Sequence, residues 1–259
     1  MRLSMEYRIL GPLDIQDGGV AVPLDGAKQR TVLAALLIAE GSLVSDTELS
    51  RLLWGEQPPT THNAQIYNHV SRLRKALGSE VSITRCSPGY LLQIGNDTFD
   101  LREFEDLAMR GQSALLAGRF EDASQPLHHA LSLWRGPALA DVSEALALTE
   151  GPRIEERRIS VVESRIEADL AIGKHTEVLP ELTRLVEQYP LRERFRAQLM
   201  TTLYRCDRQA EALVLYDGSR KMLIEELGVE PGALLRQVHQ AILTADPALH
   251  GPFGLQTAR

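Results

Sequence analysis

Residues 61–77 read THNAQIYNHVSRLRKAL, and this stretch decides how the first part of the chain is interpreted. On a helix of 3.6 residues per turn, its apolar residues at spacings of four, three and four share one side. The opposite side carries amides, a hydroxyl, a methyl group and cations, with no carboxylate. The sequence therefore predicts a helix with one face in a core and one polar-to-basic face in solvent. The apolar set is Ile66, Val70, Leu73 and Leu77, and the polar stripe is Thr61, Ala64, Gln65, Asn68, Arg72 and Lys75.

The segments around this helix predict a small α+β unit over residues 1–95. Short β-rich stretches come first, two further helical patterns follow, and Pro58-Pro59 separates these from residues 61–77. Ser45 and Glu48 fit a capping box at the start of the second helix. The order is that of a winged helix-turn-helix, with a closing hairpin around Pro88-Gly89. The expected strands are Glu6–Leu10, Leu13–Gln16, Val20–Pro23, Val81–Arg85 and Tyr90–Ile94, and the expected helices are Ala27–Glu40, Ser45–Trp54 and Thr61–Leu77.

The second part of the chain, residues 97–246, is helical in pattern, and no strand is expected past Asn96-Asp97. It contains a weak repeat in which Gly173 and Asp207 are 34 residues apart, the period of tetratricopeptide (TPR) helix pairs. An earlier copy around Gly118 implies an insertion that includes the region around Trp134–Ser143. We expect an all-α, TPR-like domain that buries its helices by stacking. Residues 247–259 are aperiodic and are interpreted as a loose tail.

The charge is unevenly distributed along the chain, and the cysteine content indicates in which compartment the protein acts. Residues 1–95 carry no net charge, and the whole net charge of −7 lies in the remainder. Cys86 and Cys206 share no metal or redox spacing, which indicates a reducing, cytoplasmic environment. The start of the chain has no export signal, and no apolar run is long enough to span a membrane.

The polar stripe has the chemistry that reads the major groove of DNA. Thr61, Gln65 and Asn68 are assigned to base edges and the methyl group of Ala64 to thymine. Arg72 and Lys75 are assigned to phosphates, which fix register without reading sequence. The alternative is an ordinary solvated helix face.

Four more cations are candidates for the same interface. Arg74, nearer the core edge beside Tyr67, is a candidate for a flanking phosphate. Arg85 on the hairpin, and Lys28 and Arg30 at the start of the first helix, are each either phosphate contacts or surface residues.

Segments on both sides of residue 96 resemble those of one known family. The matching segments are Arg30–Leu37, Leu49–Pro59, Val70–Gly78, Pro88–Leu91, Leu131–Leu139, Leu191–Glu193, Leu199-Met200, Leu203-Tyr204, Arg208–Leu213 and Glu225–Gly228 with Pro231. On these segments, the first part resembles the OmpR-type winged helix and the second the bacterial transcriptional activator domain, and this pair in this order is typical of the Streptomyces antibiotic regulatory protein (SARP) family. One departure is Cys206-Asp207, where a glycine is expected near the turn.

The resemblance implies a transcription activator of secondary-metabolite, often antibiotic, gene clusters. It implies binding to direct repeats beside the promoter, recruitment of RNA polymerase through its sigma subunit, and two protomers on DNA, with the protein on the nucleoid. No cofactor and no membrane partner is expected.

Enzyme chemistry finds no support in the sequence. There is no phosphate-binding glycine loop, no HExxH and no paired CxxC, and the adjacent His128-His129 point about 100° apart on a helix. Two rival hypotheses remain: a TPR-like protein-interaction scaffold, and a regulator that senses a small molecule in its helical domain.

Overall fold

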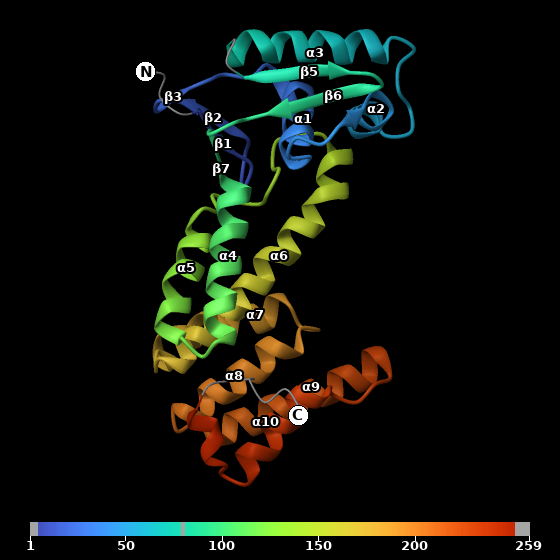
Figure 1. Cartoon of the computed structure of the whole chain (residues 1–259). Coiled ribbons are helices and arrows are strands. Elements are labelled where there is room, and N and C mark those ends of the chain that lie inside the picture. The colour runs from blue at the N-terminus through green and yellow to red at the C-terminus, as the bar shows by residue number, and fades with distance from the viewer. Residues whose placement is uncertain (1–4, 79–80, 252–259) are drawn as a thin grey trace. The chain divides into compact units, whose positions relative to one another are not determined.

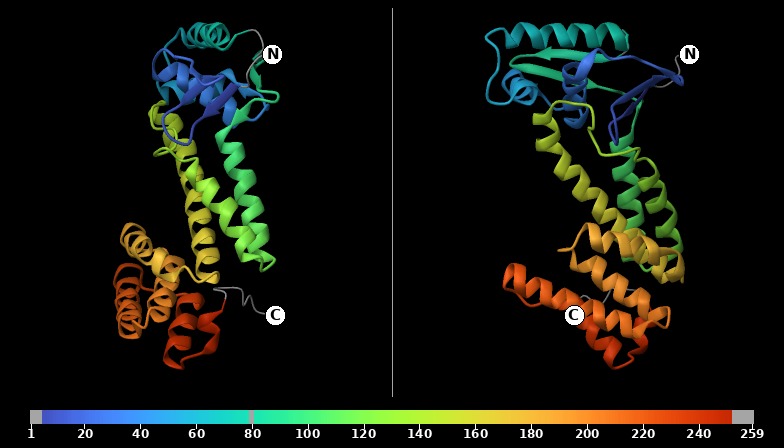
Figure 2. Two further views of the ribbon diagram at one scale, coloured as in Figure 1. Left: turned by 90° about the vertical axis from the view of Figure 1, so that its left-hand side faces the viewer. Right: turned by 180° about the vertical axis from the view of Figure 1, so that it is seen from behind.

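The computed structural model describes residues 5–78 and 81–251 of the 259-residue chain (Figures 1 and 2). It has an N-terminal α+β winged unit followed by a helical domain, which confirms the predicted fold class. Contacts divide the chain into two compact units, each made of two segments. The first holds the described residues up to Asp106 together with His129–Ile159, and the second holds Leu107–His128 and the described residues from Ser160 onward.

The first unit begins with a small sheet in the order β3-β2-β1-β7. Its last strand is a finding that the sequence did not predict, because strands were expected to stop at Asn96-Asp97. β7 has two residues, too short for an alternating pattern, and it pairs with β1 in parallel. The Asp97 carboxylate accepts a hydrogen bond from the backbone amide of Met5 at 3.0 Å and holds the two strands in register. The strands are β1 (Met5–Arg8), β2 (Asp14–Asp17), β3 (Val20–Ala21) and β7 (Thr98–Phe99).

Three helices and a second sheet complete the winged part of this unit. The helices pack pairwise, and β5 packs against α3 (Figure 2). Ser45 caps α2 as predicted, since its hydroxyl accepts the amide of Glu48 at 3.1 Å. The short strand β4, also not predicted, joins the hairpin in the order β4-β6-β5. The elements are α1 (Gly26–Ile38), β4 (Val44–Ser45), α2 (Asp46–Trp54), α3 (His62–Leu77), β5 (Ser82–Cys86) and β6 (Gly89–Gln93).

The segment 133–143 belongs to the first unit, although it lies far along the chain. It connects α5 (Phe120–Ser132) to α6 (Glu144–Ala171). Its backbone bonds the two residues just after the end of β1, with the Arg135 amide 2.8 Å from the carbonyl oxygen of Leu10 and the Leu139 amide 3.0 Å from that of Ile9. The Asp141 carboxylate accepts the amide of Leu13 at 2.8 Å. The expected insertion between helical repeats is therefore a return of the chain to its N-terminal strands.

The second unit consists of helices joined by tight turns. Each of the three repeat positions named from the sequence lies in such a turn with positive φ: +72° at Gly118, +86° at Gly173 and +59° at Asp207. The missing glycine at Asp207 thus leaves the left-handed turn in place, because Asp tolerates this conformation better than most residues. α8 packs against α7, α9 and α10. The elements are α4 (Asp100–Leu116, shared between the units), α7 (His175–Gln188), α8 (Glu193–Arg205), α9 (Gln209–Leu227), α10 (Ala233–Leu243) and the 3-10 helix η1 (Pro247–His250).

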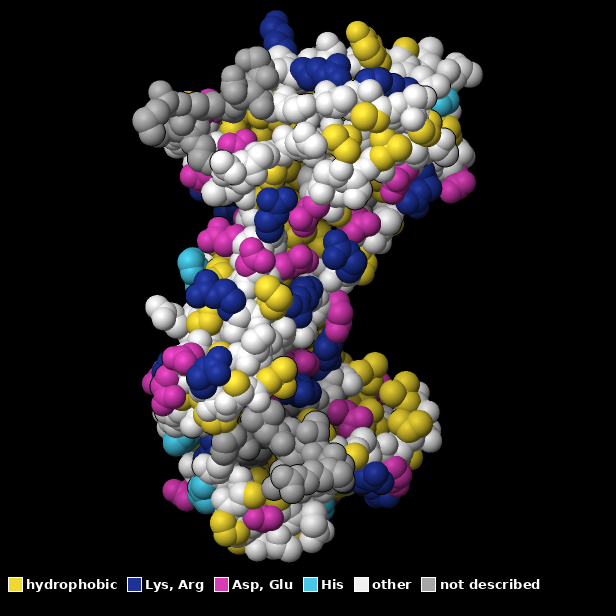
Figure 3. Space-filling view, in the orientation of Figure 1, with side chains coloured by type: hydrophobic (Ala, Val, Ile, Leu, Met, Phe, Trp, Pro, Cys, Tyr) yellow, Lys and Arg dark blue, Asp and Glu magenta, His cyan; other side chains and the backbone are white. Residues whose placement is uncertain are grey.

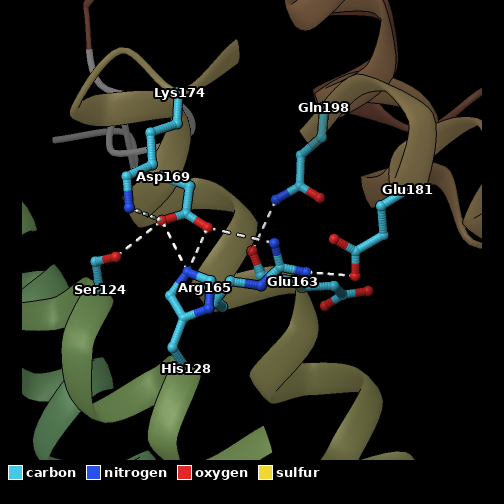
Figure 4. Close-up of polar contacts among 8 residues, drawn as sticks. All are labelled: Ser124, His128, Glu163, Arg165, Asp169, Lys174, Glu181 and Gln198. Carbon is cyan, nitrogen blue, oxygen red and sulfur yellow. Dashed lines mark hydrogen bonds and ion pairs between the residues drawn. The ribbon is translucent and has the colours of Figure 1, made fainter. Parts of the chain in front are cut away.

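A buried polar cluster fixes the helices of the second unit to one another (Figure 4). Its centre is the carboxylate of Asp169 on α6, which is 1% exposed. This group accepts the hydroxyl of Ser124 at 2.8 Å, lies 2.9 Å from Nε2 of His128 and pairs with Arg165 at 3.3 Å. Arg165 in turn pairs with Glu181 on α7 at 2.5 Å. Buried charges need such partners, so the cluster fixes how α5, α6 and α7 meet.

The segment interpreted as a loose tail starts with ordered structure. Leu249 in η1 is buried, and the Arg205 guanidinium donates to its carbonyl oxygen at 2.7 Å. Residues 252–259 lie outside the described part of the chain. Among the described residues, no helix is long and apolar enough to cross a membrane.

Candidate nucleic-acid interface

The α3 helix has the two faces that the sequence predicts. Ile66, Val70 and Leu73 are fully buried and Leu77 is 2% exposed, so the apolar side is entirely in the core. The helix begins after the Pro-Pro segment, where the His62 amide bonds the carbonyl oxygen of Pro59. The polar stripe faces solvent along its whole length, with only Gln65 half-buried, and its members are Thr61, Ala64, Gln65, Asn68, Arg72 and Lys75.

The amides and cations of this stripe are available for contacts outside the chain. The one internal contact of its polar groups that the structure shows is weak and exposed: the Gln65 side-chain amide donates to the Thr61 hydroxyl at 3.0 Å. Within the described residues, Arg72 and Lys75 form no ion pair. Lys and Arg side chains gather along α3 in the space-filling view (Figure 3). Because α3 contains no acidic residue, this surface attracts anions and offers side-chain amides beside them.

Arg74 points away from this stripe and anchors the hairpin. Its Nε and Nη2 atoms both donate to the carbonyl oxygen of Ile83 on β5, at 2.9 and 2.6 Å. Two charge-assisted bonds to one oxygen hold the guanidinium against the strand. The structure therefore gives Arg74 an internal role in placing the hairpin beside α3, and a phosphate contact remains only a proposal.

Arg85 is likewise engaged within the chain. Its guanidinium forms a two-pronged ion pair with Asp46 at the start of α2, at 2.6 and 2.7 Å. It also lies over the ring of Tyr90, 4.7 Å from the centroid. The hydrogen bond to Asp46 raises the pKa of Arg85. A DNA phosphate would have to compete with Asp46 for this side chain.

The two cations of α1 differ from each other. Arg30 bonds both the carbonyl oxygen and the carboxylate of Asp141, each at 3.0 Å, and so ties α1 to the segment 133–143. Lys28 is exposed, and its ammonium lies 4.8 Å from the centroid of the Trp54 ring. Of the pair, Lys28 keeps its charge free of any carboxylate among the described residues.

His69 is a residue of this surface that the sequence interpretation missed. It lies on the flank of α3, one turn from Gln65 and one turn from Arg72, and it is half-buried. Burial, then Arg72, then Lys28 lower its pKa below the ordinary value of 6.5. Its spacing of four residues from Gln65 and three from Arg72 could have indicated this position. That spacing places His69 at the edge of the polar stripe of α3 rather than in the core.

The adjacent residues His128 and His129 have separate partners. His128 bonds the buried Asp169, whereas the neighbouring His129 lies 4.0 Å from Glu103. In the described ranges, no group of three His, Cys, Asp or Glu residues is placed to hold a metal ion.

Comparisons with known proteins agree with this arrangement of a winged unit and a helical unit. The family model described as "Transcriptional regulatory protein, C terminal" matches residues 22–92, and "Bacterial transcriptional activator domain" matches residues 99–243. The solved structure of EmbR from Mycobacterium tuberculosis, in complex with a low-affinity phosphopeptide, is similar with a TM-score of 0.89 at 36% identity. That match covers 95% of this chain and 66% of the EmbR chain. The class is therefore that of bacterial transcriptional regulators with an activator domain.

Sequence relatives narrow the class. Regulatory protein DnrI of Streptomyces peucetius is 37% identical over 96% of this chain and 96% of its own length. Regulatory protein AfsR of Streptomyces griseus is 39% identical over 96% of this chain, which spans only 26% of that longer protein. The chain belongs to the Streptomyces antibiotic regulatory protein family. The matched models and these relatives are regulatory, so the family is one of transcription regulators and not of enzymes.

Proposed function

We propose that this chain is a sequence-specific DNA-binding activator in which α3 enters the major groove. The observation that carries the proposal is the exposed stripe of α3, which holds amides and cations but no carboxylate, and whose cations form no ion pair with any residue that the structure describes. Gln65 and Asn68 pair with bases, Thr61 and Ala64 complete the readout, and Arg72 and Lys75 hold phosphates. The hairpin lies beside α3, where the adjoining groove of DNA would pass.

The target would be direct repeats near a promoter, occupied by two copies of the chain. The helical unit would then contact RNA polymerase through its sigma subunit and activate transcription of a secondary-metabolite gene cluster. Such a protein acts on the nucleoid in the cytoplasm. Family membership supports these finer statements. Arg85, on the β5–β6 hairpin, would contact DNA only if a phosphate group replaced Asp46 as the partner of its guanidinium.

Variants of α3 test the proposal against labelled duplexes carrying a direct-repeat promoter or a scrambled sequence. Gln65→Ala or Asn68→Ala is expected to cost about 1–3 kcal/mol on the promoter and little on the scrambled duplex. Arg72→Ala is expected to weaken both duplexes alike and to lower the slope of log affinity against log salt by about 1. Glu105→Ala, on α4 outside the stripe, serves as a control.

Equal losses on both duplexes for all three variants would contradict the assigned roles. No binding to either duplex at low salt would favour the alternative function, a TPR-like protein-interaction scaffold whose winged unit serves protein contacts.

A further inference from the structure

On the flank of α3 that faces α1, a histidine lies near two cations that form no ion pair with any described residue. His69 is half-buried there, with Arg72 one turn further along the same helix. Lys28 comes from the first turn of α1, and its ammonium covers the ring of Trp54, the last residue of α2. Two helices thus each contribute one charged side chain to the surroundings of His69, and both charges are positive.

Burial and two neighbouring charges decide the protonation of His69 in the free chain. Burial lowers its pKa most, and Arg72 on α3 and Lys28 on α1 lower it further. From α2, the neutral ring of Trp54 lies under the Lys28 ammonium. β5 packs on another side of the helix through Arg74, which lies five residues from His69 and so about 140° around the axis. His69 is consequently neutral at neutral pH, because an imidazolium there would be partly desolvated and repelled by both cations.

This arrangement of positive groups favours the binding of an anion. Lys28 and Arg72 have no carboxylate partner in the described chain, and the N-terminus of α1 adds the positive end of a helix dipole. A phosphate oxygen accepts hydrogen bonds from ammonium, guanidinium and imidazolium groups alike. The cluster lies beside the groove-facing stripe, where the backbone of a duplex bound to α3 runs.

We propose that Lys28, His69 and Arg72 together bind one backbone phosphate of DNA, and that His69 takes up a proton when this phosphate arrives. The inference rests on the proposed function of α3. The negative phosphate offsets the two cations and stabilises the imidazolium, so the complex holds a proton that the free chain does not. At high pH, His69 is neutral in both the free and the DNA-bound chain. As the pH falls below that range, DNA affinity therefore rises. The limit for one proton is about a tenfold change in affinity per pH unit.

Two measurements on the full chain test this. Fluorescence anisotropy with a direct-repeat duplex, at constant ionic strength between about pH 6 and pH 8, gives the pH dependence of affinity. Calorimetry in buffers of different ionisation enthalpy gives the number of protons taken up on binding. The variants are His69→Gln, which is neutral at every pH, and the control His129→Gln, an exposed histidine on α5.

The wild-type chain and His129→Gln are expected to bind more tightly at the lower pH and to take up close to one proton. His69→Gln is expected to lose that pH dependence and the proton uptake, while circular dichroism shows it folded. In Lys28→Ala, the increase in DNA affinity on acidification is expected to begin at a higher pH. The reason is that one of the two positive charges that repel a protonated His69 is gone.

Binding by the wild type without proton uptake, or uptake that persists in His69→Gln, would overturn the inference and leave DNA recognition by α3 intact. Failure of the wild type to bind the duplex at any pH would overturn the proposed function, and this inference with it.

Discussion

The contact of Asp141 with the N-terminal strands allows a quantitative test of the first unit. Asp141→Ala removes the carboxylate that accepts the Leu13 amide at 2.8 Å and pairs with Arg30 at 3.0 Å. A hydrogen bond to a charged group contributes about 1.5–3 kcal/mol, and a partly exposed ion pair adds up to about 1 kcal/mol. Arg30 retains its bond to the Asp141 carbonyl oxygen. We expect the free energy of unfolding to fall by about 2–3 kcal/mol.

The two tryptophans make this measurement selective. Trp54 and Trp134 both lie in the first unit, so intrinsic fluorescence follows its unfolding in urea. Far-ultraviolet circular dichroism also follows the helices of the second unit. With a urea dependence of about 2 kcal/mol per molar, the fluorescence midpoint is expected to drop by roughly 1 M.

Asp106→Ala removes an exposed carboxylate of α4 and serves as the control. A fluorescence midpoint that Asp141→Ala leaves within error of this control would refute the conclusion that segment 133–143 stabilises the winged unit.

Substitutions at three further positions test other features. Asp169→Ala leaves the buried Arg165 without one of its partners and is expected to destabilise the second unit by about 3 kcal/mol, as measured by circular dichroism in urea; an unchanged midpoint would refute the structural role of the cluster. Asp207→Gly relieves a left-handed residue and is expected to stabilise by about 0.5–1 kcal/mol, whereas Asp207→Val, the matched opposite change, is expected to destabilise. In the absence of DNA, the lowered pKa of His69 means that the unfolded chain binds this proton more readily. The stability of the wild type relative to His69→Gln is therefore expected to fall as pH drops below 6.5, and a difference constant with pH would contradict the neutral state of His69.

Periodicity predicted the parts of the fold that depend on local pattern. The buried side of α3, the Ser45 cap and the turns at Gly118 and Gly173 all follow from spacing and residue type. The strands β4 and β7 did not, because two residues cannot show an alternation and their pairing depends on partners distant in sequence.

The candidate site divides in the same way. The exposed stripe of α3 was predictable, since the face opposite a buried stripe of a helix is exposed. The engagement of Arg85 by Asp46 and of Arg30 by Asp141 was not, because 39 and 111 residues separate the partners. A sequence shows where a cation is, but the fold decides which carboxylate lies near it. The same reason explains why His69 was missed: its two neighbouring cations meet only when α1 packs on α3.

The return of segment 133–143 to the end of β1 has a consequence for synthesis. The ribosome releases the winged part of the chain first, yet the groups that complete it, from Arg135 to Ser143, are made more than a hundred residues after β1. Until then the carbonyl groups of Ile9 and Leu10 and the amide of Leu13 lack these native partners. The native contacts of the N-terminal region therefore cannot all form until this later segment has been synthesised. A shortened gene that stops at residue 95 would encode a winged unit that lacks the segment 133–143.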